Sequence, residues 1–369
     1  MKITGSQKKL YLLALALLMI AVALVCAWTL WGGWEAASDA LVTPSPETDA
    51  APTLVPEDNP QDADVSAQVD TRQPAQTMST VVYYQDNYGY LVPVMCNVAY
   101  QDGIAKATLQ MMVQSPENDM NAARLGLRTV LPEGTTFDLD ISDGLARIDL
   151  SKEVLNLADA AEESNMVTAI VQTLTEFDSV EKVEFLVAGQ KREKLTHGTD
   201  ISGTFERGEI NLESAAMISD GLEPVMLYFP CESGNVVVPV TRMVYSDADV
   251  NTAVLELAKG PSTQSPLETA LPAGCGLIDV KVENGVAKVN FTSDFARLVE
   301  NTDGGRLALK ALVLTCTQFE GVESVEILVE GRPYDPGEGT LAVPSFANVA
   351  SEIEDAYIQT QASLIFDYE

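Results

Sequence analysis

The alternation of apolar and polar residues in this chain is repeated. Residues 80–205 and 224–345 show the same order of predicted elements: two strands, a helix, a hairpin, a second helix and a last strand. The second helix shows the repeat most clearly, since Met166 and Ala308, and likewise Phe177 and Phe319, are 142 residues apart. In both copies these apolar residues recur at helical spacing, so each helix is predicted to bury one face.

The turns of the two copies also coincide. A hairpin corner stands at Asp143-Gly144 in the first copy and at Asn284-Gly285 in the second, and these dipeptides are typical of two-residue hairpin turns. The order β-β-α-β-β-α-β predicts an α+β fold: two tandem two-layer domains, each with helices on one face of a small sheet. The shared positions are turn glycines, prolines and core residues, which indicates an assembly role rather than catalysis.

The copies differ after the first helix. Pro116 to Pro132 spans 16 positions, whereas Pro261 to Pro272 spans 11. Because loops carry binding surface more often than cores do, this difference suggests that the two domains have diverged in partner.

The N-terminus is predicted to anchor the chain. Residues 10–31 form a charge-free apolar stretch long enough to cross a bilayer. Lysines precede it and acids follow it, which places residues 1–9 in the cytoplasm and makes the chain a single-pass protein of the cell membrane with extracytoplasmic domains. The alternative is a cleaved signal peptide ending near Ala36-Ala37-Ser38, although its apolar core usually has about 7–15 residues. Val25 before Cys26 argues against lipidation.

Two further segments flank the repeats. Residues 35–79 are acidic and proline-rich, and are predicted to be a disordered linker that holds the domains off the membrane. Residues 346–369 form a C-terminal tail in which Val349, Ile353 and Tyr357 have helical spacing, so it could pack on the second domain or protrude.

The charge of the chain limits its possible partners, and the positions of its cysteines limit its possible disulfides. The chain has 22 Lys and Arg against 54 Asp and Glu, a net charge of −32, so we expect no nucleic acid partner. The five cysteines do not occupy equivalent repeat positions. They are interpreted mostly as free thiols, with a Cys231–Cys275 disulfide as the alternative.

The sequence has few groups of residues that could form a catalytic or metal site. His197 is the only histidine, so no His-based metal pair exists. Asp138, Asp140 and Asp143 invite a calcium interpretation, but an EF-hand loop needs glycine where Asp143 stands. We therefore predict a protein that is not an enzyme and that has no catalytic, cofactor or metal site.

Basic residues are rare enough to mark an interaction site. Lys191, Arg192 and Lys194 follow the last strand of the first copy, and Arg332 is their counterpart in the second. These four residues are the candidate interaction residues, with ordinary strand-end charge as the alternative.

The second repeat resembles the GerMN domain family. The resemblance rests on Leu257-Ala258-Lys259-Gly260-Pro261, Leu271-Pro272-Ala273-Gly274, Val282–Phe291, Leu314–Phe319 and Ile327-Leu328-Val329-Glu330-Gly331. Tandem GerMN domains behind an anchor are similar to a sporulation and spore germination protein of endospore-forming bacteria. The resemblance implies a fold like the ring-building motifs of secretion systems, and a role in assembling a transenvelope complex.

The expected function is therefore that of a membrane-anchored, extracytoplasmic scaffold of sporulation or germination. Its partners would be envelope proteins of the sporulation complex, and a homo-oligomer is compatible with this role. The alternative is a module that binds the cell wall, peptidoglycan or another glycan, for which Tyr88, Tyr90 and Tyr245 are the available aromatics.

Overall fold

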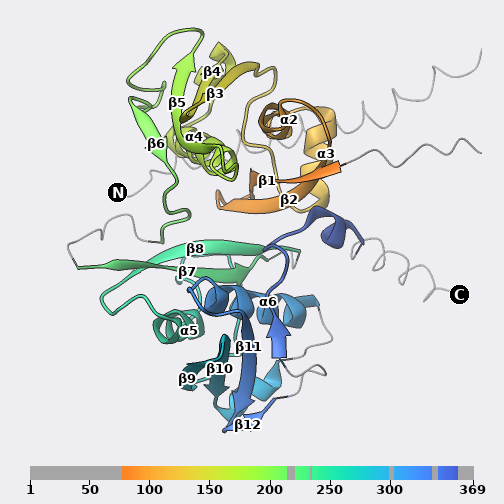
Figure 1. The fold of residues 1–369 in the computed structure, drawn as a ribbon, viewed down its shortest axis with the longest axis vertical. Helices are drawn as coiled ribbons and strands as arrows, with labels where there is room; N and C mark the ends of the chain where they lie inside the picture. Colours follow the sequence, from red (N-terminus) through yellow and green to blue (C-terminus); the bar gives the residue numbers. More distant parts are fainter. Residues whose placement is uncertain (1–76, 214–220, 233–234, 299–302, 335–339, 356–369) are drawn as a thin grey trace, which may run out of the picture. The chain divides into compact units, whose positions relative to one another are not determined.

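The computed structural model describes residues 77–213, 221–232, 235–298, 303–334 and 340–355 (Figure 1). These belong to one compact unit, Thr71–Glu369. Residues 1–9, the predicted anchor at 10–31 and nearly all of the predicted linker lie outside the described residues, as does the tail beyond residue 355. Within the described ranges, no helix has both the length and the apolar character needed to cross a membrane.

The first domain opens with a hairpin and ends in a separate sheet. The hairpin pairs β1 (Thr77–Gln85) with β2 (Leu91–Ala99). The elements that follow are α2 (Ile104–Gln110), α3 (Pro116–Arg124), β3 (Phe137–Ser142), β4 (Gly144–Leu150), η1 (Lys152–Asn156), α4 (Ala160–Leu174), β5 (Val180–Val187) and β6 (Thr204–Glu206). The sheet has the order β3-β4-β5-β6, in which β4 and β5 are parallel because α4 connects them.

The second domain repeats this plan. A hairpin of β7 (Glu223–Pro230) and β8 (Val237–Val244) precedes a sheet of order β12-β11-β10-β9. The other elements are α5 (Val250–Ala258), β9 (Leu277–Glu283), β10 (Val286–Phe291), η3 (Ser293–Arg297), α6 (Asp303–Thr317), β11 (Ser324–Val329), β12 (Arg332–Pro333) and β13 (Thr340–Ala342). Strand β13 pairs with β11, as β6 pairs with β5 in the first domain.

The helices have strands on both sides. Helix α4 contacts β1 of the hairpin and β5 of the sheet, and α6 likewise contacts β7 and β11 (Figure 1). The prediction of an α+β fold in two tandem domains is confirmed. The prediction of two layers was wrong, because the hairpin and the sheet do not hydrogen-bond to each other and enclose the helix between them. The apolar pattern of α4 identifies buried positions but not how many layers cover them.

The predicted hairpin corners are present. Asp143 and Gly144 have φ angles of 52° and 78°, and Asn284 and Gly285 have 52° and 79°. Positive φ at both central residues is what the two-residue turn requires.

The longer loop of the first domain contains α3. Ser115 caps this helix by accepting a hydrogen bond from Asn118 N. The Asn118 side chain then donates to the carbonyls of Gln110 and Val113, at 2.8 and 2.7 Å. Between α5 and β9 the second domain has no such helix, so α3 is specific to the first domain.

The described cysteines are buried and form no disulfide, so the alternative Cys231–Cys275 pairing is not found. Burial raises the pKa of Cys96 and of Cys275 to about 11, and that of Cys316 to about 12. These three thiols are therefore protonated and unreactive at neutral pH.

Candidate functional site: the contact between the two domains

The most elaborate polar arrangement in the described structure joins the two domains. Strand β2 of the first domain contacts β8 of the second. Two segments follow the sheets of the two domains and run into this contact: residues 207–213 after β6, and residues 344–349 after β13. We call them the first arm and the second arm. Each arm brings one asparagine to the contact.

Asn211 of the first arm uses its whole side-chain amide. Its Oδ1 accepts a hydrogen bond from Leu91 N at 2.8 Å. Its Nδ2 donates to Leu91 O and, across the contact, to Pro239 O, both at 2.7 Å. One side chain therefore binds β2 and β8 at the same time.

Asn348 of the second arm makes the corresponding set. Its Oδ1 accepts from Val237 N at 2.9 Å. Its Nδ2 donates to Val237 O at 2.9 Å and, across the contact, to Pro93 O at 3.0 Å. Asn348 is 1% exposed, so these hydrogen bonds are shielded from water.

The two sets are related by an approximate two-fold axis. Leu91 and Val237 are the first residues of β2 and β8, and Pro93 and Pro239 each stand two residues further on. Each asparagine binds the first residue of its own domain's strand and the proline of the other domain. A contact of this kind is self-complementary and closed.

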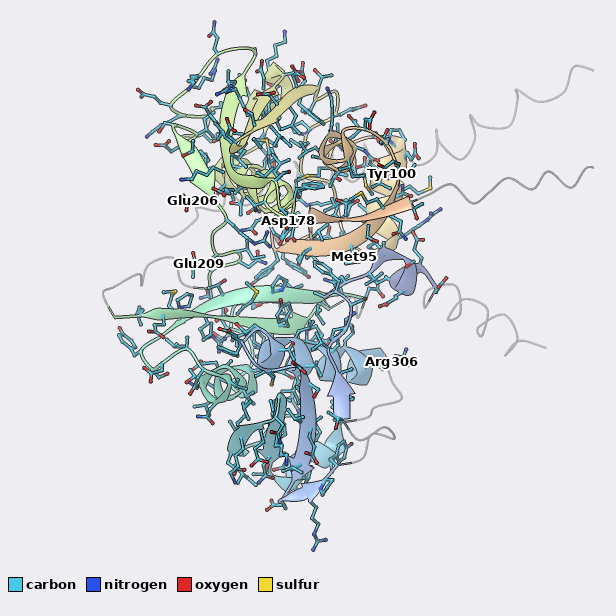
Figure 2. The ribbon with its side chains drawn as sticks, viewed as in Figure 1. Met95, Tyr100, Asp178, Glu206, Glu209 and Arg306 are labelled. Carbon is cyan, nitrogen blue, oxygen red and sulfur yellow. The ribbon has the colours of Figure 1, made fainter. Side chains whose placement is uncertain are left out.

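The two arms are exchanged between the domains, because each arm pairs with a strand of the other domain. Leu212 of the first arm pairs with Thr241 of β8, and Val349 of the second arm pairs with Met95 of β2. Figure 2 shows the place of Met95 on the face of β2 that is turned to the second domain. Met95 N donates to Asn348 O at 2.8 Å. Each arm thus extends the hairpin of the other domain, which joins the two domains through the backbone as well as through side chains.

A charged cluster lies beside the first arm. Arg207 donates to Tyr83 Oη at 2.7 Å and also to Glu176, while Tyr83 Oη donates to Glu176 at 3.0 Å. Burial raises the pKa of Tyr83, and the Arg207 charge opposes that rise only in part. Burial alone would lower the pKa of Arg207, but its interactions with Tyr83 and Glu176 outweigh that effect and keep the guanidinium ionised. A hollow of 360 Å³ here is lined from both domains, by Tyr83 and Arg207 and by Tyr228 and Phe346 among others.

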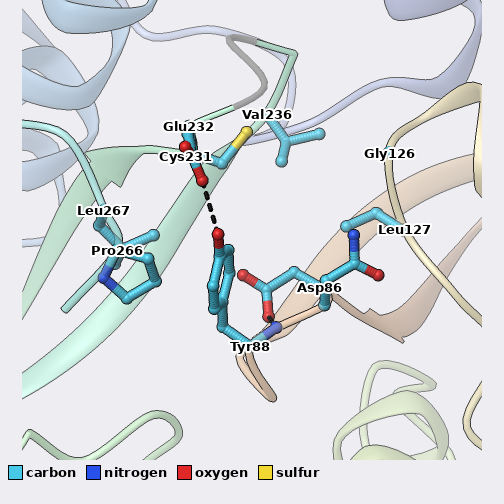
Figure 3. Close-up of a pocket in the computed structure, with 10 residues that line it drawn as sticks. Asp86, Tyr88, Gly126, Leu127, Cys231, Glu232, Val236, Pro266 and Leu267 are labelled. Carbon is cyan, nitrogen blue, oxygen red and sulfur yellow. Dashed lines mark hydrogen bonds between the residues drawn. The ribbon is translucent and has the colours of Figure 1, made fainter. Parts of the chain in front are cut away.

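A second hollow, of 270 Å³, lies between the β1–β2 turn and the β7–β8 turn. Figure 3 shows Tyr88 reaching from the first domain to Glu232, to which its hydroxyl donates at 2.6 Å. Asp86 lies beside Tyr88, and its Oδ1 accepts from Tyr88 N and Tyr90 N. Burial raises the pKa of Asp86, although these two hydrogen bonds oppose the rise. Tyr90 Oη and Ser265 Oγ, 3.0 Å apart, form another link between the domains.

The hydrogen bonds of this site join backbone segments of the two domains. In the described part of the chain, no group of three or more His, Cys, Asp and Glu side chains is placed to hold a metal ion. His197 has its Nε2 2.8 Å from Leu157 O, and its backbone N donates to Glu163 at 2.8 Å. These contacts tie the loop after β5 to the start of α4.

The predicted basic residues lie elsewhere. Lys191 pairs with Glu184, which also accepts from Arg147 Nε at 2.8 Å. Arg147 and then Lys191 hold the pKa of Glu184 below its usual range. Lys191 and Arg192 line one hollow of 350 Å³.

The other two predicted cations are exposed at different places. Lys194 pairs through its backbone with Asp200 in the loop after β5. Arg332 lies on β12 of the second domain. The structure therefore brings Lys191 and Arg192 together, whereas Arg332 belongs to the other domain.

Sequence reasoning missed both asparagines of the contact. Asn211 and Asn348 fall outside the predicted domain boundaries, in the segment between the repeats and in the tail. A signal was present, since Asn211-Leu212 and Asn348-Val349 each pair asparagine with an aliphatic residue shortly after a copy ends. That signal is too short to be distinguished from chance without the structure.

Fold and site together define a tandem α+β protein whose two domains are joined by exchanged arms. The family model Germane, described as sporulation and spore germination, matches residues 81–193 and 226–335. The chain belongs to this family.

Two relatives extend the comparison. The chain is 33% identical over 283 residues to the spore germination protein GerM of Bacillus subtilis, covering 72% of this chain and 76% of the relative. The solved structure of the tandem GerMN domains of GerM from the same organism matches with a TM-score of 0.61 at 30% identity, covering 74% of this chain and 99% of that one.

Proposed function

We propose that this protein is a membrane-anchored, extracytoplasmic scaffold of sporulation or spore germination that acts through protein–protein contacts of its two domains. The observation that carries this proposal is the contact between the domains. Asn211 and Asn348 each use both amide donors and the amide oxygen, and one donor of each bonds a backbone carbonyl of the other domain. A fixed pair presents two different surfaces at a constant spacing, which suits a scaffold.

The surfaces of the two domains support different partners. Helix α3 is present only in the first domain, and it exposes Met120. Lys191, Arg192 and Lys194 lie on the loop after β5, whereas the second domain has Arg332 alone at the corresponding place. We propose that the first domain docks an acidic envelope protein through Arg192 and Lys194, since Lys191 is already paired with Glu184.

Membrane attachment is part of the same proposal. The apolar residues 10–31 would hold the chain in the bilayer, and residues 35–79 would act as a tether for the domains. Family membership supports a place in the sporulation envelope.

The test is a chromosomal fluorescent fusion together with a deletion, in the spore-forming host. We expect expression during sporulation, localisation to the membrane and a defect in spore formation or germination. Uniform vegetative expression with normal spores after deletion would contradict the proposal. The Arg192→Glu, Lys194→Glu double variant tests the docking surface, with Arg332→Glu as the matched charge reversal in the other domain.

The alternative of a cell-wall binding module is less well supported. Tyr90 is half-buried and contacts Ser265, so it is not available to stack on a sugar. Tyr88 is 59% exposed but its hydroxyl is bound to Glu232, and Tyr245, at 79%, is the most exposed of the three. A peptidoglycan pulldown with wild type and Tyr245→Ala distinguishes this alternative from the scaffold.

A further inference from the structure

The two sheets each end in an edge strand. Strand β9 is the last strand of its sheet, and within the described residues it pairs with β10 alone. Strand β3 occupies the same place in the first domain. An edge strand leaves half of its backbone N–H and C=O groups available to a further strand, so proteins usually protect such edges with charge.

The two edges differ in side chains. On β9, Ile278 and Val282 are each 48% exposed. The residue of β3 that corresponds to Val282 is Ile141, which is packed against the core, whereas Ile278 is an extra residue without a counterpart on β3. The edge of the second domain thus shows apolar surface that the first domain does not.

The charges of β9 match a second copy of the same strand. In an antiparallel pair, residues directly opposite each other have side chains on the same face. A two-fold axis through Val280 places Asp279 of one copy opposite Lys281 of the other, and Lys281 opposite Asp279. The same operation brings the bulge at Ile278 of one copy to the end of the strand near Val282 of the other, although these two residues do not form a regular pair.

The corresponding operation on β3 gives the opposite result. A two-fold axis through Leu139 would place Asp138 of one copy opposite Asp140 of the other, twice. Like charges directly opposite destabilise a strand pair. The replacement of an aspartate by lysine between the two copies, at positions 140 and 281, therefore turns a self-repelling edge into a self-matching one.

We propose that β9 is a homotypic contact, in which two copies of this chain pair their β9 strands antiparallel about a two-fold axis at Val280. Within one chain Asp279 and Lys281 already lie 3.0 Å apart. In the pair, the two aspartates and two lysines form a ring of four alternating charges. The contact is independent of the closed contact between β2 and β8, so both can exist in one assembly.

The contact is short. Ile278 is the extra residue of a β-bulge opposite Asn290 and Phe291, so the ladder that is regular in both copies runs only from Asp279 to Lys281. A ladder of this length buries little area, so the pair forms only at high local concentration. This inference goes beyond the proposed function, because it names a second copy as a partner and does not depend on any sporulation protein.

The experiment is disulfide cross-linking of the full-length chain carrying Val280→Cys. At the axis of an antiparallel pair the two Cα atoms lie about 4.5–5.5 Å apart, which is within the range of about 4.4–6.8 Å that a disulfide needs. We expect mild oxidation to give a dimer linked through position 280. Leu139→Cys, at the same place on β3, is the matched control and should give none. The unmodified chain shows the background from its native cysteines.

Charge variants in the Val280→Cys chain decide whether the pairing is the one proposed. Asp279→Lys or Lys281→Asp alone sets like charges opposite at two positions, so the dimer yield should fall by about fivefold or more. Co-expression of these two variants under different tags should restore a heterodimer, and the double exchange should restore a homodimer.

Restoration by co-expression cannot come from a contact within one chain. The proposal is overturned by equal cross-linking at positions 280 and 139, or by yields that do not respond to charge. Either result leaves the sporulation role unaffected, because that role is judged by localisation and deletion.

Discussion

Asn348 is the residue on which the backbone groups of both domains converge. It binds Val237 N, Val237 O and Pro93 O in a site that is 1% exposed. Asn348→Ala leaves these groups buried without their partner, so we expect a loss of about 1–3 kcal/mol in the free energy of unfolding. Denaturant unfolding of the tandem domains measures it. Asn97→Ala, which removes an exposed amide that bonds Ser79, is the control and should cost far less.

The Asn348→Asp variant separates hydrogen bonding from charge. The carboxylate keeps the acceptor but faces two carbonyl oxygens in a buried site, so its folded-state pKa would be raised. A raised pKa stabilises below the unfolded value and loses that contribution as the pH rises through the folded value. We expect Asn348→Asp to match Asn348→Ala near pH 4 and to be less stable at pH 8. A pH-independent difference between the two would contradict this account.

Glu184 gives the opposite pH dependence. Its pKa is lowered by Arg147 and then by Lys191, so its contribution is present above the unfolded pKa and is lost as the pH falls through the folded value. We expect Glu184→Gln to lower the unfolding midpoint at pH 7, by less than Asn348→Ala does because Arg147 and Lys191 are largely exposed. The difference should begin to shrink below about pH 4.3, the usual pKa of Glu, and should vanish only below the lowered pKa of the folded protein. A deficit that is unchanged in acid would show that packing, not charge, is the cause.

At the scale of elements, the Asn118 side chain is the link between α3 and the end of α2. A helix of nine residues is marginal alone in water, and Asn118 ties it to the end of α2. We expect Asn118→Ala to raise hydrogen exchange in residues 116–124 by about tenfold, from a loss of about 1–1.5 kcal/mol, and to leave β4 and β5 unchanged. Met120→Ala, on the exposed side of the same helix, is the control. Equal exchange in both variants would mean that α3 is held by its other contacts.

The elements also show how far sequence reasoning reaches. The strands, helices and Asp143-Gly144 corner follow from local periodicity and turn chemistry, and the structure has them. The separation of hairpin from sheet does not follow, because α4 buries polar residues as well as apolar ones. Glu163 accepts from His197 N and Thr199 N, and Gln172 donates to Gly208 O. Such contacts join segments more than thirty residues apart, and no local sequence pattern predicts them.

Most of the candidate site could not be predicted from the sequence, because its contacts also join segments that are far apart along the chain. Asn211 and Asn348 stand in segments without periodicity, and their partners Pro239 and Pro93 are in the other domain. The basic residues 191, 192 and 194 were visible because cations are rare in this chain. The rarity of basic residues draws attention to an exposed surface, but it gives no information about the contact that the exchanged arms form.

At the scale of the whole molecule, the exchanged arms should make the two domains unfold together. Phe291 is fully buried in the second domain and stacks on Phe295 at 4.7 Å. Phe291→Ala should destabilise that domain by about 3–5 kcal/mol. Its effect should also reach the first domain at Met95, whose amide donates to Asn348 O of the second arm. We therefore expect exchange at Met95 to rise together with exchange in β10, as measured by hydrogen exchange with mass spectrometry.

The Ile148 amide is the internal comparison, because β4 lies in the sheet of the first domain and its partners β3 and β5 belong to that domain. If the domains are coupled only through the arms, Met95 responds to Phe291→Ala and Ile148 responds less. If they form one cooperative unit, both respond equally. Unchanged protection at Met95 while β10 opens would mean that the second arm stays on β2 without its domain. The contact between the two domains would then connect them without fixing their relative geometry.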